Sequence, residues 1–149
     1  ICNALKTIAL DNVNRLVIYP VHLNPKVQEP VKRILSGLSN VILIDPLPYQ
    51  DFIWLMKRSK IIITDSGGVQ EEAPSLGKPV LVLRDTTERP EAAEVGTVLL
   101  VGTNENLIVS KALDLLNNKD NFDKMSKLHN PYGDGLASAR IVNFIKSIK

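Results

Sequence analysis

Five short, unbroken apolar runs constrain the fold of this chain more than any other feature of its sequence. Because the runs do not alternate between apolar and polar residues, they indicate strands that are buried on both faces of a sheet. The segments between them are long enough to form the helical crossovers that parallel strands require. The sequence therefore predicts an α/β fold with a parallel sheet and helices on both faces. The predicted strands are Leu16 to Tyr19, Val41 to Ile44, Ile61 to Thr64, Val80 to Leu83 and Val98 to Val101.

Helical patterns follow most of these runs. Asn24 and Pro25 are typical of a helix cap and its first residue, but Pro30 predicts that the regular helix starts there and runs to Gly37. A second helix is expected from Asp51 to Ser59. Its predicted buried side is formed by Phe52, Leu55 and Met56.

Two amphipathic helices are predicted near the end of the chain. Their apolar positions are Ile108, Ala112, Leu115 and Leu116, and then Ile141, Phe144, Ile145 and Ile148. The intervening segment from Asn130 to Gly135 is rich in turn-forming residues. It is expected to redirect the last helix away from the main body.

Composition excludes several classes of function. A net charge of +2 over 149 residues is far from the dense basic field of a nucleic-acid-binding protein. The single cysteine, Cys2, rules out an internal disulfide and a thiolate-rich zinc site and fits a reducing, cytoplasmic setting. The two histidines, His22 and His129, cannot supply a multi-histidine metal centre without carboxylate ligands. No apolar run approaches the roughly 20 residues of a membrane span.

The first residues predict that the sequence is a piece of a longer protein. Ile1 leads directly into Leu5, Ile8 and Ala9 at helical spacing. The start lacks an initiator Met, a basic region and an apolar signal core. We therefore expect the chain to begin inside a helix.

The turn after the third predicted strand has the features of a phosphate site. Ligands bind at the carboxyl ends of the strands in open α/β sheets. Here Ser66, Gly67 and Gly68 lie between a strand and a helix start. Glycines let the backbone approach an anion, the serine adds a hydroxyl, and the first N–H groups of the helix point at the negative charge. The alternative is an ordinary strand-to-helix turn capped by Ser66.

The helix after this turn contains two neighbouring carboxylates. Glu72 lies one helical turn past Gly68, where it can accept hydrogen bonds from the hydroxyls of a ribose. Glu71 points elsewhere. The alternative for both residues is a solvated carboxylate favoured by the helix dipole, and this is what we expect for Glu71. Pro74 is expected to end the helix after about two turns.

Two further loops follow strands at the same predicted edge. The run from Arg84 to Glu91 is charged and hydroxyl-rich, and an arginine in it can pair with phosphate oxygens. The alternative is a solvated surface loop. His22 follows the first strand, where a lone histidine more often has a structural role than a catalytic one. No serine or cysteine nucleophile pattern supports a hydrolytic triad.

Four runs of sequence together resemble the bacterial non-hydrolysing UDP-N-acetylglucosamine 2-epimerases. They are Val21 to Pro25, Thr64 to Pro79, Arg84 to Glu91 and Asn130 to Gly135. The resemblance covers essentially the whole chain. It implies that residues 1–149 form the C-terminal, Rossmann-like UDP-binding domain of a two-domain GT-B-type fold whose N-terminal domain is absent.

The resemblance also implies a reaction. Members of the family are isomerases that interconvert UDP-N-acetylglucosamine and UDP-N-acetylmannosamine for cell-envelope polysaccharides. UDP is eliminated to leave an unsaturated sugar, and its re-addition inverts the second sugar carbon. Carried over to this sequence, Ser66, Gly67 and Gly68 would bind the diphosphate, Glu72 the ribose, and Arg89 the phosphate or sugar end.

Other roles implied by the resemblance concern the base and the cleft. Phe52 and the neighbourhood of Leu47 would contact uracil. Because the family often has glutamine at the latter position, Leu47 would offer only backbone contacts. His22 would face the interdomain cleft, where family members can bind a second UDP-sugar as an activator. No catalytic residue is assigned to this chain, because the acidic residues that handle the sugar proton belong to the absent domain. No metal or cofactor is expected.

Three competing functions remain open from the sequence. The first is the donor-binding domain of a glycosyltransferase with a GT-B-type fold, and the second is a non-enzymatic UDP-sugar sensor. The third is a hydrolysing relative of the epimerases, in which a different stretch is expected in place of Gln70 to Leu76. The Arg84 to Glu91 run favours the epimerase. We expect a UDP-sugar as ligand, the missing domain and a second copy of the protein as partners, and the helix after Leu136 to pack on the missing domain.

Overall fold

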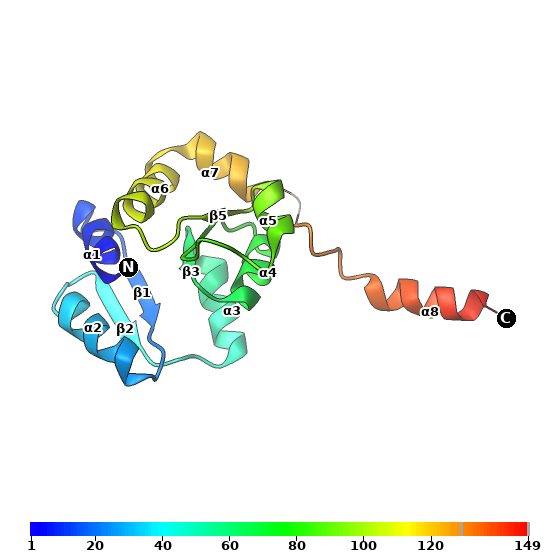
Figure 1. Cartoon of the computed structure of the whole chain (residues 1–149), viewed down its shortest axis with the longest axis horizontal. Coiled ribbons are helices and arrows are strands. Elements are labelled where there is room, and N and C mark those ends of the chain that lie inside the picture. Colours follow the sequence, from blue (N-terminus) through cyan, green and yellow to red (C-terminus); the bar gives the residue numbers. More distant parts are fainter. Residues whose placement is uncertain (129, 149) are drawn as a thin grey trace.

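Helices and short strands alternate along the chain in a computed structural model (Figure 1). The structure describes residues 1–128 and 130–148, so His129, one of the two histidines considered above, lies outside the described residues. The strands are β1 (Val17–Pro20), β2 (Val41–Ile44), β3 (Ile62–Thr64), β4 (Val80–Val82) and β5 (Val98–Leu100). The helices are α1 (Cys2–Asp11), α2 (Pro25–Leu35), α3 (Tyr49–Arg58), α4 (Gly67–Ser75), α5 (Pro90–Val95), α6 (Glu105–Asn117), α7 (Lys119–Ser126) and α8 (Ala137–Ser147).

All the strands pair in parallel, and each lies within one residue of its predicted position. Hydrogen bonds divide them into two sheets, with the orders β1-β2 and β3-β4-β5. The prediction of parallel strands is confirmed, but the hydrogen bonding is not continuous between β1 and β3. Apolar runs indicate burial and carry no information about which strand edges pair, which explains the difference.

Helices cover both faces of the three-stranded sheet, as predicted. Leu81 of β4 packs in one cluster with apolar residues of α1 and α6. Its neighbours Val80 and Val82 point to the other face and pack against α3 and α4. A third cluster joins α2 to β1 and β2. Ile63 of β3 packs against the first and the third cluster, so side chains connect the two sheets where backbone hydrogen bonds do not.

Helix α2 begins earlier than the sequence predicted. The side chain of Asn24 accepts the N–H of Lys26 at 3.0 Å, and Pro25 is the first helical residue. Pro30 lies inside the helix, so the prediction that the helix starts there is wrong. Val31 and Leu35 are fully buried in the third cluster, and this packing offsets the backbone hydrogen bond that a proline inside a helix loses.

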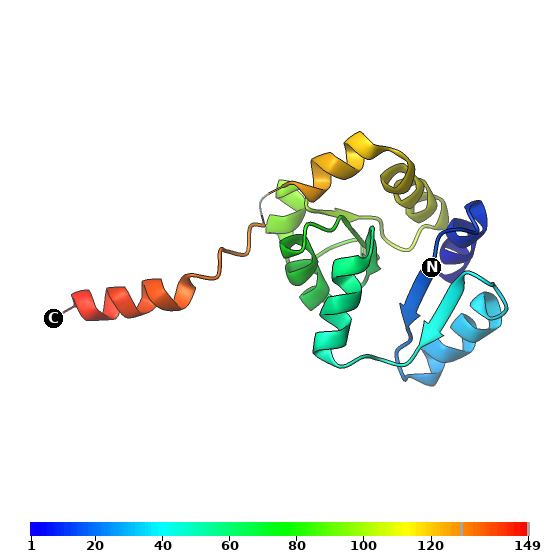
Figure 2. The ribbon, with the colours of Figure 1, turned by 180° about the vertical axis from the view of Figure 1, so that it is seen from behind.

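The two late amphipathic helices are present, and they have different surroundings. Helix α6 buries Ile108, Ala112 and Leu115, as predicted. Helix α8 buries no residue and extends away from the body in both views (Figures 1 and 2). None of the helices in the described part of the chain is long and apolar enough to cross a membrane.

Candidate functional site

The turn between β3 and α4 presents the start of a helix at the carboxyl end of the sheet. Ser66 has an extended backbone, with φ −79° and ψ 130°, and its N–H donates to Oγ1 of Thr64 at 3.0 Å. The Ser66 side chain makes no capping hydrogen bond to the helix. The first N–H groups of a helix have no partner within it. The alternative interpretation, an ordinary turn capped by the Ser66 side chain, is therefore not supported, because that hydrogen bond is absent.

The local backbone does not require glycine at positions 67 and 68. Neither has a positive φ. A Cβ atom added to either would meet nothing within 4 Å. Glycine in a helix costs roughly 0.5–1 kcal/mol relative to alanine. Since the chain itself gives no reason for these glycines, the open space in front of them is suited to close approach by a ligand such as an anion.

Glu72 lies beside the first residue of α3. Desolvation, together with the charge of the neighbouring Glu72 carboxylate, raises the pKa of the Tyr49 phenol. Glu72 is half-buried on the second turn of α4. Sequence reasoning missed Tyr49, because nothing in the pattern shows that α3 begins next to α4. The carboxylate predicted to hold ribose thus has a neighbouring hydroxyl that can orient it.

Arg89 forms an ion pair with Glu71. Its Nε donates to a carboxylate oxygen of Glu71, and its Nη1 donates to the backbone carbonyl of Glu88 at 3.2 Å. The hydrogen bond and the charge of Glu71 raise the pKa of Arg89. The prediction that Glu71 is simply a solvated carboxylate is wrong. The loop before α5 folds back over α4, which brings the two side chains together.

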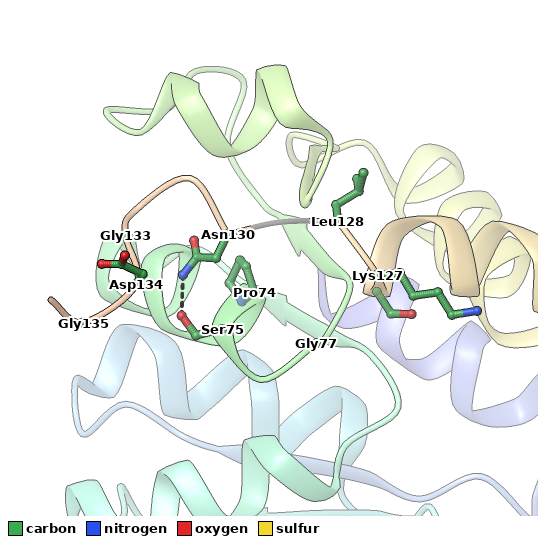
Figure 3. A pocket seen from close by; sticks show the side chains of 10 residues that line it. Pro74, Ser75, Gly77, Lys127, Leu128, Asn130, Gly133, Asp134 and Gly135 are labelled. Atoms are coloured by element: carbon green, nitrogen blue, oxygen red, sulfur yellow. Dashed lines mark hydrogen bonds between the residues drawn. The ribbon is translucent and has the colours of Figure 1, made fainter.

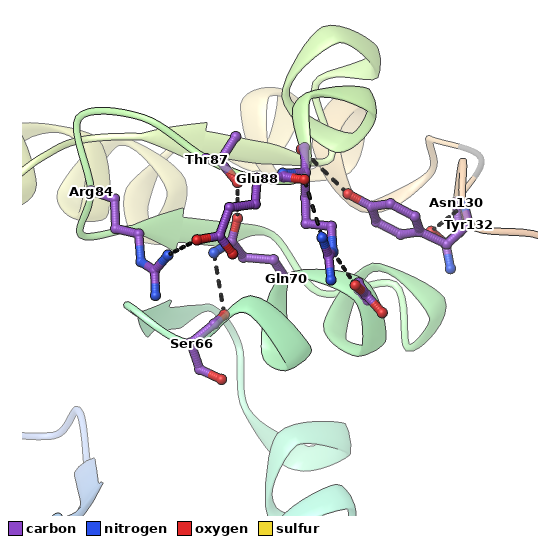
Figure 4. A network of polar contacts seen from close by, with 9 residues as sticks. Ser66, Gln70, Arg84, Thr87, Glu88, Asn130 and Tyr132 are labelled. Carbon is purple, nitrogen blue, oxygen red and sulfur yellow. Dashed lines mark hydrogen bonds and ion pairs between the residues drawn. The ribbon is translucent and has the colours of Figure 1, made fainter.

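A buried glutamine connects this loop to the turn (Figure 4). Gln70 is 1% exposed. Its side-chain oxygen accepts the Thr87 hydroxyl at 2.6 Å, and its side-chain nitrogen donates to the Ser66 carbonyl at 3.3 Å. Sequence reasoning missed Gln70 as well. A polar residue where the α4 pattern requires burial was the available signal.

The loop from Arg84 to Glu91 is thus structured rather than simply solvated. Arg84 pairs with Glu88 at 3.6 Å; the Glu88 side chain is largely exposed and that of Arg84 is partly exposed. The phenol of Tyr132, from the turn-rich segment, donates to the backbone carbonyl of Arg89 at 3.3 Å. The loop that carries Arg89 is therefore held by Gln70 of α4 and by Tyr132 of the turn-rich segment.

The remaining predicted residues lie apart from one another. His22 is exposed, and its Nδ1 accepts the N–H of Asn24 at 3.1 Å, which stabilises the turn before α2. Leu47 lines an apolar groove of about 450 Å³ with residues of β1, β2 and α3, among them Ile42 and Trp54. Phe52 is not among the residues that line this groove and packs partly buried against the cluster that contains α4. The structure therefore does not bring Leu47 and Phe52 into one pocket.

A second hollow, of about 640 Å³, lies at the other end of α4 (Figure 3). Nδ2 of Asn130 donates to Oγ of Ser75 at this hollow. The residues that line it are Pro74, Ser75, Gly77, Ser126, Lys127, Leu128, Asn130, Gly133, Asp134 and Gly135. Ser75 is eight residues from Gly67, roughly 12 Å along a helix. This hollow is therefore separate from the predicted phosphate turn. Within the described ranges, no cluster of three or more His, Cys, Asp or Glu side chains could hold a metal ion.

Comparisons with known proteins agree on one family. The family model described as UDP-N-acetylglucosamine 2-epimerase matches residues 1–146. The UDP-N-acetylglucosamine 2-epimerase of Campylobacter jejuni is 57% identical over 145 residues, which are 97% of this chain and 38% of the relative.

Two solved structures agree with this match. The UDP-GlcNAc 2-epimerase of Neisseria meningitidis bound to UDP-GlcNAc is 46% identical with a TM-score of 0.90, over 98% of this chain and 40% of that one. The S. aureus MnaA–UDP co-structure is also 46% identical, with a TM-score of 0.92 over 99% and 40%.

These comparisons confirm the predicted fold class and the resemblance. The glycosyltransferase alternative is not favoured, because the matching family model and the named relatives are epimerases. The chain spans about two fifths of the length of the relatives it matches. It belongs to the UDP-N-acetylglucosamine 2-epimerase family.

Proposed function

We propose that this chain is the UDP-binding domain of an isomerase that interconverts UDP-N-acetylglucosamine and UDP-N-acetylmannosamine. The turn from Ser66 to Gly68 carries the proposal, because its backbone is open to a ligand at a helix N-terminus. Membership of the epimerase family adds the identity of the ligand, since the Neisseria meningitidis relative was solved with UDP-GlcNAc.

In the proposed reaction this domain holds the leaving group. The bond between the anomeric carbon and the diphosphate breaks, and its electron pair leaves with UDP. A base outside this chain takes the proton from the second sugar carbon, so a double bond forms between the two carbons. The N–H groups of Gly67 and Gly68 and the hydroxyl of Ser66 stabilise the charge that develops on the diphosphate. Re-addition of UDP with a proton delivered to the opposite face completes the inversion.

Arg89 adds a positive charge to the same region. Its pairing with Glu71 keeps the guanidinium beside α4, and about two fifths of each side chain remains exposed. A phosphate oxygen can therefore approach the guanidinium without complete separation of the ion pair. The Glu72 carboxylate accepts the ribose hydroxyls, and the Tyr49 phenol lies beside it.

The uracil and cleft assignments belong to the same proposal. Leu47 precedes α3 and Phe52 lies in its first turn, without sharing a pocket. A base attached to a ribose at Glu72 would lie near the start of this helix. The backbone of Leu47 and the partly buried ring of Phe52 are the proposed contacts. His22 faces the cleft between domains, with its Nδ1 already occupied by the N–H of Asn24.

The proposed partners follow from the family and from the surface of α8. A further domain of the longer protein completes the catalytic cleft and covers the apolar face of α8, on which Phe144 is 67% exposed. We expect the complete enzyme to be a cytoplasmic homodimer that does not bind nucleic acid and needs no metal or cofactor. This chain alone is expected to bind UDP without catalysing epimerisation.

A titration of this chain with UDP tests the nucleotide assignment, with CMP as the control. UDP should shift the amide resonances of Gly67 and Gly68, and CMP should not. Glu72→Ala should weaken the UDP response, and Glu94→Ala is the matched control, since Glu94 is an exposed glutamate on α5. Equal responses to UDP and CMP, or none at millimolar UDP in a folded chain, would contradict the proposal.

A domain exchange tests the reaction. This chain replaces the corresponding 145 residues of the Campylobacter jejuni enzyme, to which it is 57% identical. The hybrid should epimerise UDP-N-acetylglucosamine, as followed by proton NMR of the sugar. A folded hybrid that binds UDP but leaves the sugar unchanged would refute the assigned activity.

A further inference from the structure

Gln70 uses both ends of its buried side-chain amide to join two parts of the proposed site. Its oxygen accepts the Thr87 hydroxyl, and the oxygen of that hydroxyl accepts the N–H of Arg89 at 3.0 Å. Its nitrogen donates to the Ser66 carbonyl. A continuous chain of hydrogen bonds therefore runs from the backbone of Arg89 to the backbone of Ser66 (Figure 4).

This chain of hydrogen bonds orients the N–H of Gly67. The Ser66 carbonyl accepts from the backbone N–H of Gln70 and from its side chain, both at 3.3 Å. The peptide unit between Ser66 and Gly67 is planar and trans, so its carbonyl and its N–H point in opposite directions. With the carbonyl held toward Gln70, the N–H of Gly67 is directed out of the helix toward the open space.

The same residue determines where the Arg89 loop lies. Among the residues that the structure describes, the other polar contact from α4 to this loop is the Glu71–Arg89 ion pair, whose side chains are each about 40% exposed. Exposed ion pairs contribute little to holding a loop in one place. The hydrogen bond from the half-buried Thr87 to the fully buried Gln70, at 2.6 Å, is a stronger constraint, because losing it leaves a buried amide oxygen unpaired.

We propose that Gln70 and Thr87 are positioning residues that hold the Arg89 loop and the Ser66–Gly68 turn in the one relative placement that binds a diphosphate. This inference rests on the proposed function and adds residues to it that do not touch the nucleotide. Gln70 acts through the Gly67 N–H, and Thr87 acts through the placement of Arg89.

A double-mutant cycle on UDP affinity tests the proposal. Thr87→Val removes the hydroxyl with little change of volume and should weaken UDP binding about five-fold or more, and Thr87→Ser should restore it. In an Arg89→Gln background, Thr87→Val should change the affinity by less than about two-fold, because the group it positions is gone. Thr7→Val, at an exposed position of α1, is the matched control.

The outcomes separate this inference from the proposed function. If the folded wild-type chain does not bind UDP, the proposed function fails and the inference fails with it. If the wild type binds UDP but Thr87→Val binds equally well, or loses the same factor with and without Arg89, only the inference is overturned. Gln70→Met removes both side-chain hydrogen bonds at similar volume and should weaken UDP binding in the Arg89→Gln background as well, because Gln70 also orients the Gly67 N–H. Unchanged UDP affinity on adding Gln70→Met to Arg89→Gln would overturn the role of Gln70. Amide spectra establish that each variant is folded.

Discussion

Helices α6 and α8 have the same kind of apolar periodicity but opposite surroundings. In α6, Ile108 is fully buried in a cluster with α1 and β4. In α8, Phe144 and Ile145 are 67% and 62% exposed. The comparison shows that a helical pattern predicts an apolar face, whereas what covers that face depends on distant parts of the protein. For α8 we propose that the covering surface is the further domain.

The largest effect on stability is expected from a substitution in the buried face of α6. Ile108→Ala should lower the free energy of unfolding by roughly 2–5 kcal/mol, because it leaves a cavity in the cluster between α1, α6 and β4. Urea denaturation measures the change. A loss below about 1 kcal/mol would mean that α6 packs less tightly in solution than its burial indicates.

The second-largest effect is expected from the N-terminal caps, in which the two helices also differ. The Asn104 side chain accepts the N–H of Leu107 at 3.0 Å at the start of α6, whereas Leu136 gives α8 no side-chain cap. Asn104→Ala should cost about 1 kcal/mol of stability in the same assay. Asn106→Ala, an exposed asparagine within the first turn of α6, is the matched control. Equal losses in both variants would show that the cap contributes nothing.

Acidification should have a smaller effect, through the helix beside α6. On α7 a hydrogen bond from Lys119 is the main cause that lowers the pKa of Asp123, with Lys127 adding to it. Because the folded pKa lies below the unfolded one, this stabilisation is present above the unfolded pKa and is lost as pH falls through the folded value. Asp123→Asn should therefore lose less stability than the wild type between neutral and acid pH. Parallel stability curves for the two proteins would contradict this origin of the shift.

The smallest effect on stability is expected from a substitution in the exposed apolar face of α8. Ile145→Ala in α8 should change the free energy of unfolding of this chain by less than about 0.5 kcal/mol, since its side chain has no buried contacts to lose. It is the counterpart of Ile108→Ala, so the same urea titration serves for both. A loss as large as that of Ile108→Ala would show that α8 packs against the body.

Local patterns predicted much of the fold. The strands match within one residue, and α4 ends at Ser75, directly after Pro74, as expected. Pro30 misled the prediction because its local cost is outweighed by the burial of Val31 and Leu35, which depends on strands elsewhere in the chain. The absence of hydrogen bonding between β1 and β3 could not be predicted either, since burial alone does not determine strand pairing.

The candidate site was predicted unevenly for the same reason. Ser66, Gly67 and Gly68 are neighbours in sequence, so a local pattern could identify the turn. The pairing of Glu71 with Arg89 joins residues 18 positions apart, and the Gln70–Thr87 hydrogen bond joins residues 17 apart. No periodicity within α4 or the loop indicates that the loop folds back over the helix. Family resemblance named Arg89 without showing which side chain holds it.

In the proposed function, the space in front of Gly67 is reserved for a diphosphate. Gly67→Ala tests it most directly, because the added methyl group meets no atom of the chain within 4 Å. Stability should be unchanged or higher by up to about 1 kcal/mol, because alanine favours a helix over glycine. UDP affinity, measured by calorimetry, should fall by about ten-fold or more, which corresponds to roughly 1.4 kcal/mol. Unchanged UDP affinity in a stable Gly67→Ala chain would contradict the account.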